Sequence, residues 1–193
     1  MSAVLIVAIF VGLGLIIFCY DNIQYPIKYT EEINAASEEF GVQKELIASV
    51  INAESHYNEK AISIKGAVGL MQIMPSTAEW ILNKMYNENY TVQKLSQTEL
   101  FDNNKSDGLL FDPELNIRIG AYYIAYLLNK FQDVNTALCA YNAGEGKVSE
   151  WLNSNEFSSD KRILKKIPYH ETENYVSKVN MNLKIYRKKL NNR

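Results

Sequence analysis

The stretch from Gln43 to Ser55, QKELIASVINAES, determines how the rest of the sequence is interpreted. Apolar residues recur along it at helical spacing: Leu46, Ile47, Val50 and Ile51. This spacing predicts a helix with one face against a core. Continuing that face by three or four residues reaches Glu54, so the pattern places an acid where a hydrophobic side chain belongs.

A carboxyl group at the position of Glu54 is expected to stay protonated. Burial disfavours the charged form, and the negative end of the helix macrodipole also disfavours an anion. Both effects raise a pKa, and a general acid working near neutral pH needs a raised pKa. A helix-terminal glutamate turned toward solvent is the alternative, and the apolar pattern alone leaves both interpretations open.

Length and composition indicate one compact domain. The chain has 193 residues, of which 47% are hydrophobic, enough for a core. Its 20 basic and 22 acidic residues give a net charge of −2, so we expect no nucleic-acid partner. Cys19 and Cys139 are expected to be free thiols. Two histidines and no calcium-loop spacing predict no metal site, and no cofactor is implied.

The N-terminus is strongly apolar. Residues 3–20 carry no charge and have about the length needed to cross a bilayer. We predict an uncleaved transmembrane anchor over residues 1–20, a tether over 21–29 and a globular domain over 30–190. A cleaved signal peptide is the competing interpretation, but the start Met1-Ser2 lacks basic residues and no A-x-A-like site follows. Lys and Arg barely mark the orientation of the anchor.

Beyond the tether, helical patterns follow one another. The signals include a start at Thr30 with a stop at Gly41, a capping box from Ser96 to Glu99, and a start at Asp112-Pro113. The remaining predicted helices cover residues 76–86, 136–142 and 147–152 and a long C-terminal segment from about 175 to 190. No alternating strand pattern is present, so the predicted fold class is all-α, with little or no sheet.

Four segments are difficult to explain by packing alone: Glu54-Ser55, GLMQIMP at 69–75, AYNAG at 140–144 and IPYHETENYV at 167–176. Together with N-x-x-x-G at 116–120, they resemble in order the soluble lytic transglycosylase family. The resemblance covers roughly residues 29–188. It implies a lysozyme-like, goose-type fold and, as substrate, the glycan strands of peptidoglycan.

The resemblance also implies a role for each matched residue. Glu54 matches the catalytic acid and base. The residues matched to substrate binding are Ser63, Met71, Gln72, Tyr141, Asn142, Glu171 and Tyr175. Ser63 would support the surroundings of the reacting sugar, Gln72 would hydrogen-bond sugar or peptide groups, and Tyr141 would orient and hydrogen-bond Glu54. Core packing is an open alternative for Met71 and Met74, as is a plain loop position for Ser63.

The activity implied by the resemblance is cleavage of the β-1,4 bond between N-acetylmuramic acid and N-acetylglucosamine, with formation of 1,6-anhydromuramoyl ends. Goose-type muramidase activity, in which water attacks the same bond, is one alternative. An inactive, membrane-anchored glycan-binding scaffold of wall synthesis or a secretion apparatus is another. For this substrate the expected location is the bacterial cell membrane, with a single span and the catalytic domain facing the wall.

Overall fold

The computed structural model describes residues 10, 12–14, 19–102 and 107–191. Within these residues the chain is helical, and paired extended backbone is limited to the isolated bridges Ile62–Val68, Val68–Ile73 and Asp102–Asp107. The helices are α2 (Thr30–Phe40), α3 (Lys44–Glu54), α4 (Pro75–Asn87), α5 (Gln97–Leu100), the 3₁₀ helix η1 (Leu109–Phe111), α6 (Pro113–Phe131), α7 (Val134–Ala143), α8 (Glu145–Asn153) and α9 (His170–Asn191). The predicted all-α class is confirmed for this part of the chain.

Local signals set the helix ends. Gly41 closes α2 in the left-handed conformation at φ 68°, which glycine adopts without strain. The Asp112 side chain accepts a hydrogen bond from the Leu115 amide at 2.8 Å and so caps the start of α6. The capping box of Ser96 and Glu99 is present at α5. The predicted helices are therefore confirmed, with ends that differ by a few residues.

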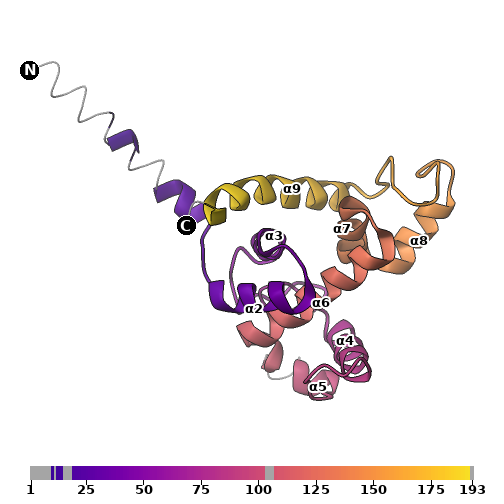
Figure 1. Cartoon of the computed structure of the whole chain (residues 1–193), viewed down its shortest axis with the longest axis horizontal. Helices are drawn as coiled ribbons and strands as arrows, with labels where there is room; N and C mark the ends of the chain where they lie inside the picture. Colours follow the sequence, from indigo (N-terminus) through magenta and orange to yellow (C-terminus); the bar gives the residue numbers. More distant parts are fainter. Residues whose placement is uncertain (1–9, 11, 15–18, 103–106, 192–193) are drawn as a thin grey trace, which may run out of the picture.

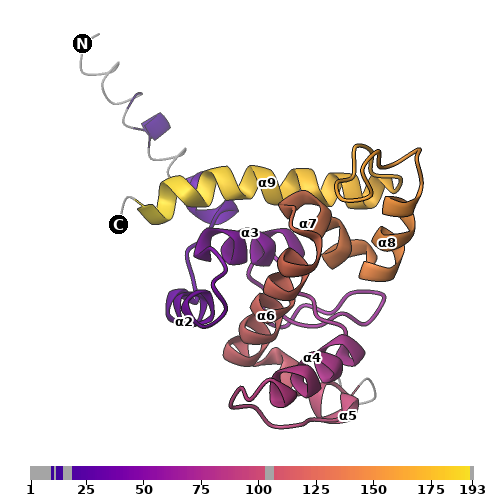
Figure 2. The same ribbon diagram turned by 45° about the vertical axis from the view of Figure 1, so that its right-hand side comes forward.

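The central helix α3 lies between α2, α6 and α9 (Figure 1). Residues 46–52 of α3 are buried, and they include the apolar stripe of Leu46, Ile47, Val50 and Ile51. In Figure 2, α9 runs along α3, while α4 and α5 lie on the other side of the molecule. The segment between α3 and α4 lies between the α4–α5 pair and the α7–α8 pair (Figure 2).

Buried Asn116 of α6 fastens that segment to the core. Its side-chain oxygen accepts from the Met71 amide at 2.8 Å, and its side-chain nitrogen donates to the carbonyls of Val68 and Leu110 at 3.0 and 2.8 Å. A Cβ atom on Gly120 would lie 2.3 Å from the sulfur of Met71. The N-x-x-x-G motif therefore combines three hydrogen bonds with a gap that admits a methionine.

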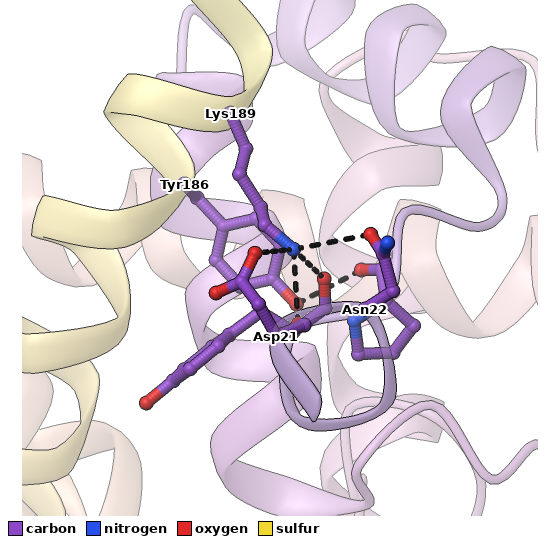
Figure 3. Close-up of polar contacts among 6 residues, drawn as sticks. Asp21, Asn22, Tyr186 and Lys189 are labelled. Atoms are coloured by element: carbon purple, nitrogen blue, oxygen red, sulfur yellow. Dashed lines mark hydrogen bonds and ion pairs between the residues drawn. The ribbon is translucent and has the colours of Figure 1, made fainter. Parts of the chain in front are cut away.

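The segment predicted as a tether is held against α9. Lys189 Nζ binds the backbone oxygens of Asp21 and Tyr25 at 3.0 and 2.9 Å, and the Asp21 carboxylate at 2.6 Å (Figure 3). Asn22 Oδ1 lies 3.5 Å from the same ammonium group. The predicted anchor falls largely on residues outside those described. None of the helices among residues 10, 12–14, 19–102 and 107–191 has the length and hydropathy of a membrane span.

Candidate active site

Glu54 ends α3 and lines a cavity of about 380 Å³. We refer to it as the Glu54 cavity; its lining residues are Glu54, Ser63, Ile64, Lys65, Ala67, Gln72, Met74, Tyr141, Asn142 and Glu171. Six of the predicted site residues therefore meet in one place, although they come from α3, α7, α9 and the segment before α4. The two others, Met71 and Tyr175, lie behind the cavity wall and are buried.

The Glu54 carboxyl has the acid–base character that the sequence predicts. Burial raises its pKa from 4.5 to about 7. The Tyr175 hydroxyl and, more weakly, the positive charge of Lys178 act in the opposite direction, because both favour the carboxylate. The result is a group that is partly protonated at neutral pH and can both donate and accept a proton.

Tyr175 and Lys178 approach Glu54 from α9. The Tyr175 hydroxyl is buried and has no hydrogen-bond partner of ordinary geometry among the described residues. Burial and the nearby Glu54 hold its pKa well above the usual value, so it remains a hydrogen-bond donor. Lys178 Nζ donates to the carbonyl oxygen of Ala53 at 2.6 Å, and so places a cation at the C-terminal end of α3.

Lys178 is a site residue that the sequence analysis missed. It lies three residues after Tyr175 in α9, a spacing that puts both side chains on neighbouring parts of one helix face. The spacing from Tyr175 could have pointed to Lys178. The sequence did not show that this face of α9 contacts the end of α3.

Tyr141 lies beside Glu54, but its hydrogen bond differs from the expectation. Its hydroxyl donates to the carbonyl oxygen of Met71 at 2.8 Å, so the predicted hydrogen bond to Glu54 was wrong. The Tyr141 ring packs against Tyr123, with ring centroids 5.3 Å apart. Burial, together with the charge of Glu54, raises the pKa of Tyr141 well above its usual value. Tyr141 thus fixes the cavity wall through the backbone of the GLMQIMP segment.

The two methionines of this segment have different surroundings. The Met71 side chain is 0% exposed and packs against Gly120, so it does not line the cavity as we expected. Met74 is 37% exposed and is the methionine that lines it. The segment is irregular, so no periodicity distinguishes an inward from an outward methionine.

Ser63 and Gln72 shape the loop wall of the cavity. Ser63 Oγ accepts from the Ala67 amide at 2.9 Å, which closes a tight turn. Gln72 has a left-handed backbone at φ 49°, and its side-chain nitrogen donates to the carbonyls of Ala61 and Gly69 at 3.1 and 2.9 Å. The Gln72 amide nitrogen is therefore used within the loop, and its side-chain oxygen is the group left to meet a ligand.

Asn142 and Glu171 form the opposite rim. Asn142 Oδ1 accepts from Thr172 Oγ1 at 2.8 Å, which joins the end of α7 to the start of α9. The Glu171 carboxylate is exposed and lies 4.0 Å from Lys65 Nζ, on the loop that faces it. Exposed ion pairs of this kind contribute little to stability, so both side chains are available to a ligand.

The cleft continues beyond the Glu54 cavity. A second cavity of about 330 Å³ shares Lys65 and Met74 with it and extends to Gln97, Thr98 and Phe101 at α5. Because they share two lining residues, the two cavities adjoin and form a longer cleft, to which Glu54 contributes a carboxyl group with a raised pKa. Such a shape suits a polymer better than a small compact ligand.

Comparisons with known proteins identify the family of this helical domain. The family model described as the transglycosylase SLT domain matches residues 31–164. The chain belongs to this family.

Similar proteins carry related names. The chain is 32% identical over 158 residues to the soluble lytic murein transglycosylase of Escherichia coli K12, covering 81% of this chain and 22% of that protein. It is 31% identical to the membrane-bound lytic murein transglycosylase C of Edwardsiella ictaluri, covering 83% of this chain and 47% of the relative. The chain thus spans between about a fifth and a half of the length of these relatives.

A solved structure shares the fold. The structure of an inactive Glu-to-Gln mutant of lytic transglycosylase Slt from Pseudomonas aeruginosa superposes with a TM-score of 0.70 at 31% identity. The match covers 88% of this chain and 25% of that chain. The helical arrangement is therefore that of a lytic transglycosylase domain.

Proposed function

We propose that this protein is a peptidoglycan lytic transglycosylase that cleaves the β-1,4 bond between N-acetylmuramic acid and N-acetylglucosamine. The single observation that carries the proposal is Glu54, a half-buried carboxyl group with a pKa of about 7 that lines the cleft. Family membership and the names of the relatives, soluble and membrane-bound lytic murein transglycosylases, support the choice of substrate.

Glu54 acts first as an acid. Its proton passes to the glycosidic oxygen, so the bond from that oxygen to the muramoyl C1 breaks and positive charge develops at C1. The muramoyl N-acetyl oxygen assists as this charge develops. The glycan with the new hydroxyl leaves, and Glu54 is now a carboxylate.

Glu54 then acts as a base. The carboxylate takes the proton of the muramoyl 6-hydroxyl, and the 6-oxygen bonds to C1 to close the 1,6-anhydro ring. Glu54 is protonated again and no water is consumed. Burial stabilises the acid that begins the cycle, whereas Tyr175 and Lys178 stabilise the carboxylate formed halfway. A pKa near neutrality serves both half-reactions.

One carboxyl group suffices for this route. Most glycosidases use two carboxyl groups flanking the bond, one of them as base or nucleophile. Glu171, the other carboxylate of the cavity, is exposed at the rim and faces Lys65. An internal nucleophile, the 6-hydroxyl, therefore fits the cavity better than a second enzyme carboxylate. Attack by water in the manner of a goose-type muramidase is the competing outcome.

The test is digestion of purified cell walls followed by mass spectrometry of the products. Glu54→Gln is expected to lower the rate by about 10²–10⁴-fold, the usual contribution of acid–base catalysis, with unchanged circular dichroism. The exposed Glu173→Gln variant serves as matched control and should retain activity. Wild-type products should carry 1,6-anhydromuramoyl ends. Reducing ends would assign hydrolysis instead, and an active Glu54→Gln variant would remove Glu54 from the mechanism.

We also place this activity at the cell membrane, in a single-pass protein whose domain faces the wall. The uncharged apolar residues 3–20 support an anchor, and several relatives are named membrane-bound. External protease on intact bacteria should remove the domain beyond residue 41. A domain shielded from that protease would contradict the wall-facing orientation.

A further inference from the structure

The N-terminal segment leaves the domain at the C-terminal end of α9 (Figures 1 and 2). The Lys189 contacts hold the backbone of Asp21 and Tyr25 there (Figure 3). Tyr186 adds a hydrogen bond to the Pro26 carbonyl at 3.0 Å and an edge-on contact with the Tyr25 ring, with centroids 6.3 Å apart. We call this set of contacts the α9 clamp. The clamp fixes residues 21–26 against the C-terminal end of α9.

Apolar side chains lie uncovered within the clamp segment and just before it. Phe10, Leu13, Tyr20 and Ile23 are all exposed in the part of the chain that the structure describes. Residues 19–24, which include Tyr20 and Ile23, are helical. Large apolar side chains gathered on an exposed segment indicate an apolar partner, and tyrosine is a residue favoured where such a partner meets water.

The same end of the molecule is strongly basic. From residue 184 to its last residue, Asn191, α9 carries Lys184, Arg187, Lys188 and Lys189 and no acidic residue, and Lys189 is paired with Asp21 in the clamp. In the last turns of α9, Lys184 and Lys188 are exposed four residues apart, and Arg187 donates to Gln43 Oε1 at 3.1 Å. Among the described residues, no ion pair neutralises Lys184, Arg187 or Lys188 at this end of α9.

Two further cations reach this end from other elements. Lys28 and Lys44 line a cavity of about 280 Å³ together with Tyr186 and Leu190 of α9. The helix macrodipole explains cations at the C-terminal end of α9, but it disfavours a cation at Lys44, the first residue of α3. Within the described residues no ion pair joins Lys28 or Lys44 to an acid. These positions are therefore poorly explained by helix stability alone.

We propose that this end of the domain docks on the surface of an anionic phospholipid bilayer. The cations Lys28, Lys44, Lys184, Arg187 and Lys188 lie against the headgroups, and the exposed apolar side chains before the clamp enter the acyl region. Cations near a membrane surface are drawn to anionic headgroups within about a Debye length. The inference rests on the membrane location proposed above, and it does not depend on the chemistry of Glu54.

Docking at this end sets the height of the cleft. Glu171, at the rim of the Glu54 cavity, and Lys189, in the clamp, lie in the same helix, α9. At 1.5 Å per residue their separation along the helix is about 27 Å. With α9 upright on the bilayer, docking of the clamp at the headgroups would hold the Glu54 cavity about 27 Å from them, toward the glycan of the wall.

The test is lysine footprinting of the full chain in lipid nanodiscs. Discs of phosphatidylcholine alone are compared with discs that also contain phosphatidylglycerol, and acetylation by a water-soluble reagent is followed by mass spectrometry. In the anionic discs, acetylation of Lys28, Lys44, Lys184 and Lys188 is expected to slow about fivefold, matching the attraction of one cation to an anionic surface. The exposed Lys161 and Lys165, beyond α8, are matched controls and should react equally in both lipids.

Two variants complete the test. The triple change Lys184→Gln, Arg187→Gln and Lys188→Gln should remove the lipid dependence at Lys28 and Lys44. Glu54→Gln should leave the footprint unchanged, which separates docking from catalysis. Equal rates in the two lipids, equal protection of Lys161 and Lys165, or a chain not retained on the discs would each overturn the proposal. Protection of Lys65, which lines the Glu54 cavity, would overturn the separation between cleft and bilayer.

Discussion

Replacing Glu54 by glutamine is expected to stabilise the fold at alkaline pH, although the same change is expected to slow wall digestion. Burial raises the pKa of Glu54 from 4.5 to about 7. Each pKa unit corresponds to about 1.4 kcal/mol, so the native state holds this proton about 3 kcal/mol more tightly than the unfolded chain does. Once the pH is high enough to remove the proton from the native protein as well, the wild-type fold is less stable by this free energy than it is with Glu54 protonated.

The direction of the effect follows from which state releases the proton first. Between pH 4.5 and 7 the unfolded chain has lost the Glu54 proton and the native protein keeps it, so the free energy of unfolding falls as the pH rises. Above pH 7 both states are ionised and the native state carries the full desolvation penalty. Glutamine has no proton to lose. Glu54→Gln should therefore match wild type below pH 4.5 and exceed it by about 3 kcal/mol above pH 7.

Urea denaturation followed by circular dichroism across this pH range measures the difference directly. The control is Glu173→Gln, because Glu173 is an exposed acid of α9 outside the cavity and its loss should leave the wild-type pH dependence in place. An equal stability difference between Glu54→Gln and wild type at both ends of the range would show that the pKa of Glu54 is not raised. A variant less stable than wild type above pH 7 would show the same.

Three further changes probe the surroundings of the site. Lys178→Met removes a cation that lowers the pKa of Glu54, so the alkaline limb of kcat/KM should move to higher pH, while Lys178→Arg should keep the wild-type profile. Asn116→Ala leaves buried backbone groups without partners and should lower the free energy of unfolding in urea by about 3 kcal/mol. Gly120→Ala pushes a methyl group against the Met71 sulfur and should lower the same quantity by about 1–3 kcal/mol, with reduced wall digestion.

Each of these changes has an outcome that contradicts its premise. An unchanged pH profile for Lys178→Met would show that the charge of Lys178 is screened from Glu54. A fully stable Asn116→Ala protein would show that the three hydrogen bonds of Asn116 are replaceable. Unaltered stability of Gly120→Ala would mean that the Met71 side chain moves aside without loss of packing.

The helices could be predicted from the sequence because their signals are local. The stripe of Leu46, Ile47 and Val50 spans two turns, and the stop at Gly41 and the cap at Asp112 each act within a few residues. The position of Glu54 at the end of the stripe followed from the same periodicity. Its raised pKa, a consequence of burial on that face, was therefore also predictable.

The contacts that complete the site are not local. Tyr141 lies 70 residues from its partner, the Met71 carbonyl, and Lys178 lies 125 residues from Ala53. The choice between Met71 and Met74 as the cleft methionine depends on where α6 offers a gap, which is at Gly120. No periodicity of the irregular segment encodes that choice, because side-chain direction there is set by the helix against which it packs.

The long helix α9 links the chemistry of the site to its position. One end supplies Tyr175 and Lys178, which offset part of the burial of Glu54 and bring its pKa to about 7. The other end carries Lys189, which holds the N-terminal segment. The same helix thus carries both the residues that shift the pKa of Glu54 and the residue that holds the N-terminal segment.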